Sequence, residues 1–363
     1  MAEKRSKSSW AWATRLLTDL FTGANLVTLC LLWACCLSTW VNPAIHPRIS
    51  VMGLLFPVFL FLNVGFLVLW LIYKPRMVLL PLVGMALCGS YILDYFPLNM
   101  SSDEQEDDLT VISWNTGYFQ NLPTDSLDLA VEQFVQYGAD IMCLQESRPG
   151  SVFQKVLEQH SSAAGYHELT VGSKVLLTQF PILSHTVIEA ESTGNNNVIA
   201  ADILMDGDTV TLLNAHLECY HFSVDEKDEY GNALQSRDRN VMKEEMKFLT
   251  GKLASASRYR GLQTRELENF LDALPPSRPV ILCGDFNDTP ISYVYQRMDK
   301  RFDNAFRSRG FGAGFSYREL KFPVRIDHIF HSRDWECSSA RYDRQMTASD
   351  HFPLVAKLRK RQK

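Results

Sequence analysis

The chain has 363 residues, of which 46% are hydrophobic and 21% charged, and its formal net charge is −5 at pH 7. Residues 1–100 hold seven of the 36 Lys and Arg and three of the 41 Asp and Glu, which leaves a net charge of about −9 for the rest. A domain with this charge does not hold nucleic acid by bulk charge, so an anionic substrate needs a metal ion or a local basic patch.

Three apolar segments follow one another near the N-terminus, at about residues 20–41, 51–73 and 77–96. Each is about as long as a helix that crosses a bilayer core of roughly 30 Å. Because three such segments in succession leave no polar face for solvent, buried core helices and a cleaved signal are weaker interpretations. We predict three transmembrane helices, so that residues 1–100 form a membrane anchor.

The orientation of the anchor follows from the basic residues beside the predicted spans. These are Lys4, Arg5, Lys7 and Arg15 before the first span, Lys74 and Arg76 between the second and third, and Arg48 in the first loop. Cytoplasmic loops carry the excess of Lys and Arg, which puts the N-terminus in the cytoplasm. After three crossings of the inner membrane, the remaining chain is expected on the outer, periplasmic side.

Beyond an acidic linker at 101–108, strand-like runs alternate with helical ones, which favours an α/β sandwich with mixed or antiparallel sheets. Helices are expected at 124–138, at 151–159 and over about 223–274, the last as two helices broken near Gly261. The turn residues DGDT predict a hairpin. The expected strands are 109–115, 140–146, 174–180, 181–188, 198–205, 209–218, 279–285, 325–332, 336–343 and 352–358.

Polar residues recur at the ends of these strands. Any one of them is compatible with a capping or turn role, but six coincidences at strand ends predict a shared site. They are Asn115, Glu146, His216, Asp285 with Asn287, Asp327, and Asp350 with His351.

The motifs around these residues resemble those of the endonuclease/exonuclease/phosphatase superfamily, which has a deoxyribonuclease I-like fold. The motifs ISWN, DIMCLQES, LNAHLE, GDFND, RIDHIF and SDHFPL occur in the order and approximate spacing of that superfamily. The similarity covers essentially residues 109–360 and is greatest to membrane-anchored bacterial members. It implies a catalytic domain at 109–363, built as a four-layer α/β sandwich of two mixed β-sheets flanked by helices, with a metal-dependent phosphoesterase site at one edge.

The resemblance also implies roles for the residues at the strand ends. It implies that Asn115, Glu146 and Asp350 bind a divalent metal ion, Mg²⁺ or Mn²⁺, which prefers oxygen ligands. It makes Asp327 the residue that orients His351, and either His351 or Asp285 the general base. The substrate-binding residues are Asn287 and His216, which also count among the catalytic residues. Among Asn195 to Asn197, which precede the strand that leads to His216, Asn197 is a further candidate for binding the phosphate, and a polar turn is the alternative interpretation.

Three further features have less direct interpretations. His328 points to the opposite face of its strand from Asp327 and is expected to be structural. The basic stretch from Cys219 to Arg260 is either a lid or patch for an anionic headgroup or a solvated helix face. Residues 310–320 are expected to form a loop beside the site.

The sequence thus predicts a membrane-tethered, divalent-metal-dependent phosphoesterase. Its expected partners are the membrane and an anionic phosphoester, either a lipid headgroup or nucleic acid, and no obligate protein partner is inferred. The alternative functions are an endonuclease or exonuclease outside the cytoplasm and, more distantly, an inactive binding module.

Overall fold

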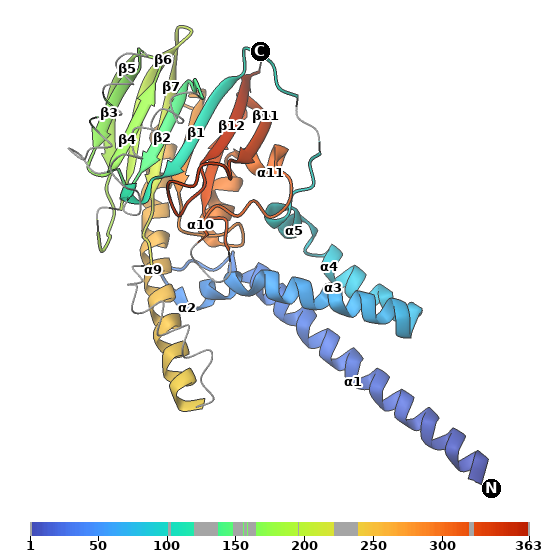
Figure 1. Cartoon of the computed structure of the whole chain (residues 1–363). Coiled ribbons are helices and arrows are strands. Elements are labelled where there is room, and N and C mark those ends of the chain that lie inside the picture. Colours follow the sequence, from blue (N-terminus) through green and yellow to red (C-terminus); the bar gives the residue numbers. More distant parts are fainter. Residues whose placement is uncertain are drawn as a thin grey trace.

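Two six-stranded β-sheets face each other, and a group of apolar helices lies at the N-terminal end of the chain (Figure 1). This computed structural model describes residues 2–100, 103–119, 137–147, 155, 158, 165–194, 196–220, 239–318 and 323–361. The helices predicted at 124–138 and 151–159 lie outside the described residues except for a few positions.

Both sheets are mixed, as predicted. Their strand orders are β11-β12-β1-β2-β4-β3 and β5-β6-β7-β8-β10-β9, and the parallel pairs β1–β2 and β7–β8 each have antiparallel neighbours. The strands are β1 (Leu109–Asn115), β2 (Ile141–Gln145), β3 (His167–Val171), β4 (Lys174–Thr178), β5 (Ile182–Ile188), β6 (Val198–Met205), β7 (Asp208–His216), β8 (Val280–Asp285), β9 (Asp303–Asn304), β10 (Asp327–His331), β11 (Trp335–Tyr342) and β12 (Leu354–Lys360).

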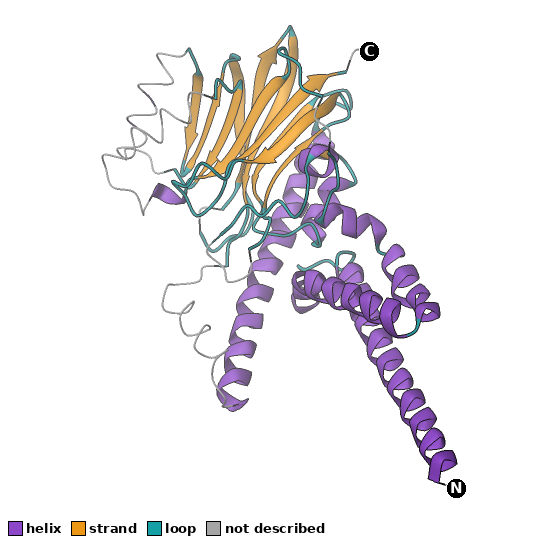
Figure 2. Ribbon diagram, turned by 45° about the vertical axis from the view of Figure 1, so that its right-hand side comes forward, coloured by secondary structure: helices purple, strands orange, loops and turns teal. Residues whose placement is uncertain are grey.

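Apolar side chains from both sheets fill the space between them. Val111 and Cys143 come from the first sheet, Leu212 and Ile281 from the second, and all four are buried in one cluster. Helices α9 (Arg239–Ala273) and α10 (Tyr293–Asp299) cover the outer face of the second sheet, where Leu267 packs on the strands (Figure 2). Because β8 is covered on both faces, its sequence is a continuous apolar run rather than an alternating one.

The expected hairpin joins β6 to β7. Asp206 and Gly207 have φ of +53° and +84°, which is the conformation that a two-residue turn between antiparallel strands requires. Two short strands, β3 and β9, were not predicted. The side chains of β3 are exposed or half-buried, so the strand lacks the apolar pattern that marks the others.

Helix α9 is continuous from Arg239 to Ala273, so the predicted break near Gly261 is wrong. Gly261 instead lets the helix approach the loop that joins the first two apolar helices. A Cβ at this position would lie 2.8 Å from the backbone nitrogen of Ala44. The glycine thus allows close packing and does not end the helix. The sequence alone did not distinguish these two roles of a glycine.

The anchor region contains two helical stretches long and apolar enough to cross a membrane, Trp12–Ser38 and Pro47–Tyr73. They belong to α1 (Ala2–Ser38) and to the run of α2 (Pro47–Ser50), η1 (Val51–Leu55) and α3 (Phe56–Tyr73). Asn25 donates to Asn63 across 2.9 Å, and Trp70 donates to Asn25 across 3.0 Å. These buried polar side chains of the two apolar helices therefore bind one another.

The third predicted span is not one straight helix. It consists of η2 (Pro75–Val78) with α4 (Leu79–Ala86), followed by α5 (Gly89–Tyr95), and the two parts are bent by 70°. At the bend the N–H of Cys88 donates to the carbonyl of Met85, which tightens the last turn of α4. The anchor therefore has two unbroken helices of spanning length, and a third only if the bent pair counts as one.

The end of α5 is joined to the sandwich by a buried polar contact. The Asp94 carboxylate is 3% exposed, forms an ion pair with Arg307 in α11 (Ala305–Arg309), and accepts a hydrogen bond from Gln296 at 2.9 Å. The Asp94 carbonyl accepts from Arg325, which lies just before β10. Residues 103–108, the described part of the predicted linker, also contact the sheet, because Asp108 pairs with Arg359 of β12.

We expect Gly284→Ala to lower the free energy of unfolding by about 3 kcal/mol or more. Gly284 has φ of +146°, and a Cβ there would lie 1.9 Å from the carbonyl oxygen of Ala215 on β7. Thermal unfolding of the full chain in detergent measures the effect. The control is Gly251→Ala within α9, where no atom lies within 4 Å of the added Cβ; equal destabilisation by both variants would contradict the explanation.

Candidate active site

The strand ends singled out in the sequence converge at one edge of the sandwich. In the strand register Asn115 lies beside Gln145 in the first sheet, and Asp285 lies between His216 and Asp327 in the second. The two sheets face each other, so these ends meet across the gap between them: the Asn115 amide donates to the Asp285 carboxylate at 2.9 Å.

Asp327, His351 and Asp285 form a buried chain of acid, imidazole and acid. Nδ1 of His351 lies 2.9 Å from Oδ2 of Asp327, and its Nε2 lies 3.9 Å from Oδ2 of Asp285. The Asp285 carboxylate also accepts from the backbone N–H of Asn287 at 2.8 Å. With Nδ1 held by Asp327, the other ring nitrogen faces the second acid.

A second group lies beside this chain and shares Asp285 with it. The Asn115 amide donates to Glu146 at 3.2 Å as well as to Asp285, while its oxygen accepts from the N–H of Gly117 at 3.0 Å. Nε2 of His216 lies 3.4 Å from Glu146 and 4.0 Å from Asp285. Asn115 therefore bridges two carboxylates, and His216 is oriented toward the same pair.

Two of the site residues have a left-handed backbone conformation. Glu146 has φ of +52° and Asn287 has φ of +50°, a region that costs a non-glycine residue energy unless neighbours hold it. The carbonyl of Glu146 accepts from the hydroxyl of Thr116 and from the N–H of Tyr118. The side-chain amide of Asn287 donates to the Leu217 carbonyl at 3.0 Å. Both residues are thus fixed at the point where the chain leaves its strand.

Burial and mutual repulsion disfavour the negative charges at this edge. Burial, and next the charge of Asp327, raise the pKa of Asp285 to about 7, and burial also raises the pKa of Glu146. Burial by itself lowers the pKa of His351, but Asp327, Asp285 and Asp350 outweigh it and raise the pKa to about 10. Among the described residues, the ion pairs of Glu146 and Asp285 are with histidines alone.

This surplus of acid suits a divalent cation. Glu146, Asp285, Asp327 and Asp350 bring carboxylate oxygens together without a Lys or Arg partner in the described part of the chain, and hard cations prefer such oxygen ligands. Asp285, Asp327 and His351 also offer ligand atoms that all lie within 4.8 Å of one another. That trio differs from the predicted metal set of Asn115, Glu146 and Asp350. As placed, Asn115 presents its amide nitrogen to the acids.

The structure places the remaining predicted residues around this centre. Asp350 lies beside Gly117, where an added Cβ would be 2.8 Å from its Oδ1. The carbonyl of Asn197 accepts from the N–H of His216, and its side-chain oxygen is buried without a hydrogen-bond partner among the described residues. Asn195, a neighbouring alternative, lies outside the described residues. His328 packs against Phe286 instead, and burial lowers its pKa to about 3, as expected of a core residue.

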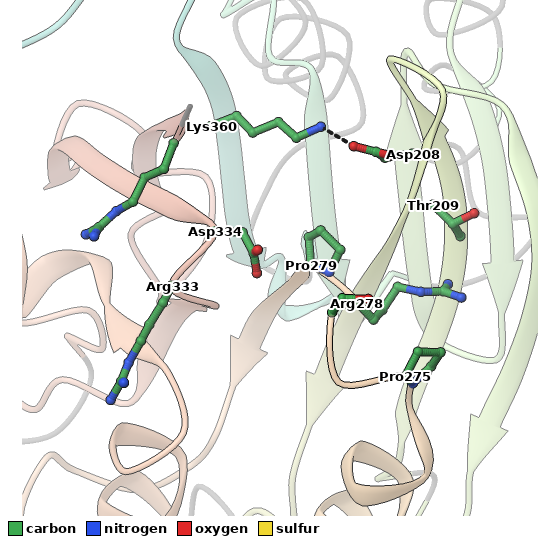
Figure 3. A pocket seen from close by; sticks show the side chains of 10 residues that line it. Asp208, Thr209, Pro275, Arg278, Pro279, Arg333, Asp334 and Lys360 are labelled. Atoms are coloured by element: carbon green, nitrogen blue, oxygen red, sulfur yellow. Dashed lines mark hydrogen bonds and ion pairs between the residues drawn. The ribbon is translucent and has the colours of Figure 1, made fainter. Parts of the chain in front are cut away.

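A cavity of about 680 Å³ lies at the opposite edge of the sandwich, near the start of β7 and β8 (Figure 3). Two of its four basic side chains are paired with acids: Lys360 binds Asp208 at 2.7 Å, and Arg278 binds Asp202 at 3.0 Å. None of the strand-end residues lines it. Its lining lacks the histidines and strand-end carboxylates of the acidic edge, so the acidic edge is the candidate site.

Sequence reasoning missed the side chain that holds two of the site loops together. Arg260 on α9 is 1% exposed and donates to Asp288 at 3.1 Å and to the Glu218 carbonyl at 2.8 Å. These acceptors come two or three residues after His216 and Asp285. The sequence showed Arg260 only as one of several basic residues on a long helix, and a contact between distant segments has no local signal.

Comparisons with known proteins agree with this architecture. The profile of the Endonuclease/Exonuclease/phosphatase family matches residues 112–351, and that of a domain of unknown function (DUF8431) matches residues 18–95. No curated protein matches the chain. The chain belongs to the endonuclease/exonuclease/phosphatase family, whose members hydrolyse phosphoester bonds and generally use a divalent metal.

Solved structures show the same fold at low sequence identity. The human Nocturnin catalytic domain, solved with a bound sulfate anion, is 18% identical with a TM-score of 0.52, and the alignment covers 73% of this chain and 96% of that one. TDP2 from D. rerio, complexed with a single-strand DNA product, is 15% identical with a TM-score of 0.50 and coverages of 70% and 100%. A functionally unknown protein from Enterococcus faecalis V583 is 15% identical with a TM-score of 0.50 and coverages of 69% and 100%.

Removal of the Arg260 guanidinium should destabilise the protein by about 3–5 kcal/mol, because it leaves a buried carboxylate unpaired. Thermal unfolding of Arg260→Met, Asp288→Asn and the double variant forms the test. The double variant should lose less stability than the two single variants together, since they remove the same pair. Strict additivity would show that the pair does not act as a unit.

Divalent metal should stabilise the protein more at high pH than at low pH. Glu146 and Asp285 have raised pKa values, so in acid they hold protons that a cation must displace. The increase in melting temperature with Mg²⁺ is therefore expected to grow from about pH 5 to about pH 8 and to shrink in Glu146→Gln. An increase independent of pH, or unchanged in the variant, would place the metal elsewhere.

Proposed function

We propose that the protein is a membrane-tethered, divalent-metal-dependent phosphoesterase whose active site is the acidic edge of the sandwich. The observation that carries the proposal is the buried row of Asp327, His351 and Asp285, in which His351 is hydrogen-bonded to Asp327 and lies 3.9 Å from Asp285, next to the carboxylate of Glu146. A buried imidazole between two acids costs stability, and such arrangements of shifted pKa values are concentrated at functional sites.

The water that attacks phosphorus has to lose a proton to a nearby base. His351, whose pKa is raised to about 10, is a cation at neutral pH and holds its protons on both nitrogens. Asp285, whose pKa is raised to about 7, is close to half ionised and can accept one. We therefore assign Asp285 as the base and His351, oriented by Asp327, as the cation that stabilises the ionised carboxylate.

The phosphoryl group meets donors on the same edge. One hydrogen of the Asn287 amide is used by the Leu217 carbonyl, and the other is left to a phosphoryl oxygen. His216 lies beside Glu146 and donates from Nε2 when protonated. Glu146, with Asp350 and Asn115 close by, would hold a divalent metal ion, which would supply positive charge toward a phosphoryl oxygen. Asn197, with its buried side-chain oxygen, lines the strand next to His216.

Contacts at the two ends of the anchor support three crossings of the membrane. Tyr73, at the end of α3, hydrogen-bonds to Thr14 and Thr18 near the start of α1. At the other end Gly53 abuts the carbonyl of Ile291, and Asp94 pairs with Arg307. The bent pair α4–α5 therefore returns from the far end of the anchor to the sandwich. With the basic residues at the far end, this arrangement favours a catalytic domain on the outer side of the inner membrane.

A nuclease is the second candidate, and the DNA-bound structure of TDP2 from D. rerio, which shares the fold, keeps it open. The negative charge of the outer part and its attachment to apolar helices favour a small phosphoester or a lipid headgroup. Incubation of the full chain with fluorescent DNA and RNA separates the two. Cleavage of either polymer at a turnover well above that of a simple diester would favour the nuclease.

The enzyme is expected to hydrolyse bis-p-nitrophenyl phosphate or p-nitrophenyl phosphate with Mg²⁺ or Mn²⁺ and to be inactive in EDTA. His351→Ala and Asp285→Ala should each lose roughly 10² to 10⁴ in rate, because one removes the base and the other removes the cation that stabilises its ionised form. Asp208→Asn, at the opposite edge, is the matched control and should keep full activity. Metal-dependent activity that survives both site substitutions would refute the proposed site.

A further inference from the structure

The N-terminal part of α9, residues 240–253, carries large apolar side chains in exposed positions. Val241 is 46% exposed, Met242 39%, Met246 43% and Phe248 50%. On the remainder of the helix, from about Ala254 onward, apolar residues such as Leu267 are buried against the sandwich. The two parts of one continuous helix therefore have different surroundings.

The pattern along residues 240–253 is amphipathic and basic. Met242, Met246, Leu249 and Leu253 recur at i, i+4, i+7 and i+11, which places them on one face of the helix. Between and beside them lie three lysines, Lys243, Lys247 and Lys252, against two acids, Glu244 and Glu245. Apolar side chains on one face and lysines around them are the pattern of helices that lie in a membrane interface. The local charge is opposite to that of the domain as a whole.

The position of α9 relative to the anchor agrees with this pattern. At Gly261 the helix touches the loop at residues 42–44 between the two long apolar helices, and it also packs against α2 and η1. From Arg239 to Arg260 it runs on for roughly 33 Å at 1.5 Å per residue. Figures 1 and 2 both show this half of α9 projecting from the sheets on the same side as α1.

The site edge of the sandwich faces the same side. Ile291, six residues after Asp285, is buried in a cluster with Leu32, Cys35 and Phe56 of the anchor. Arg260, next to Gly261, binds Asp288 in the loop that follows Asp285. The anchor and α9 thus stand on either side of the loops that carry the site.

We propose that residues 240–253 of α9 lie in the headgroup region of the bilayer that holds α1 and α3, in contact with anionic phospholipid. Met242 and Met246 insert among the upper acyl chains, and Lys243 and Lys247 bind the phosphates. This second contact rests on the proposed membrane tethering. It holds the site edge close to the bilayer surface, where the substrate is a phosphoester carried by a lipid.

The test uses the full chain reconstituted in vesicles of phosphatidylcholine and phosphatidylglycerol that contain radiolabelled phosphatidylglycerol. The photoreactive residue p-benzoylphenylalanine replaces Met246 in one variant and Glu244 in a second. Glu244 is two residues away on the opposite face of the helix, with a side chain 71% exposed, so it is the matched control. Val27 of α1, 59% exposed, is the position that reports the anchor itself. We expect label at Met246 and Val27 and several-fold less at Glu244.

The outcomes separate this inference from the proposed function. Label at Val27, with Met246 no stronger than Glu244, would overturn the inference and leave the tethering intact. Label at neither position would overturn both. Crosslinking of Met246 to a second copy of the chain instead of lipid would also overturn it. Lys243→Glu with Lys247→Glu should reduce the label at Met246 to the level at Glu244, and no reduction would refute the role of the lysines. None of these readouts requires catalysis, so a loss of enzyme activity would not by itself lower the label at Met246.

Discussion

The site depends on the buried carboxylate of Asp285, at the end of β8, because its negative charge must be stabilised away from water. It accepts hydrogen bonds from Asn115 and Asn287 and lies near two histidines, yet its surroundings still raise its pKa to about 7. Burial strengthens each of these interactions because no water screens them. The close approach of Gly284 to Ala215 and the left-handed turn at Asn287 are the backbone features that bring this carboxylate into the gap between the sheets.

The same strand ends connect the site to the anchor. Arg325, which donates to the Asp94 carbonyl of α5, lies two residues before Asp327, the acid that orients His351. On the other side of the site, Arg260 of α9 holds the loop after Asp285. Ordered polar contacts of this kind fix relative position more strictly than apolar packing does, because each donor needs its own acceptor. Arg325 and Arg260 therefore connect the loops of the candidate site to α5 and α9 through buried polar contacts.

The sequence predicted that these polar residues lie together because of how strands end. A buried strand such as 280–285 is an apolar run, and the first polar residues after it must lie at the sheet edge, where Asp285 and Asn287 are found. The hairpin at Asp206 and Gly207 was equally local. The third span was only partly predicted, since the bend between Ala86 and Gly89 serves a contact of Asp94 with Arg307 more than 200 residues away.

The sequence by itself determined the alternation of strands and helices, the apolar helices and the set of polar residues that end the strands, because each follows from periodicity or composition within a short window; the two mixed sheets were implied by the family resemblance. Only the tertiary structure decided which of these residues share hydrogen bonds, that Gly261 packs against the anchor loop instead of ending a helix, and that Arg260 joins two site loops. Those outcomes depend on which distant segments meet in the folded chain, and a pattern read along the sequence carries no information about the distance between them.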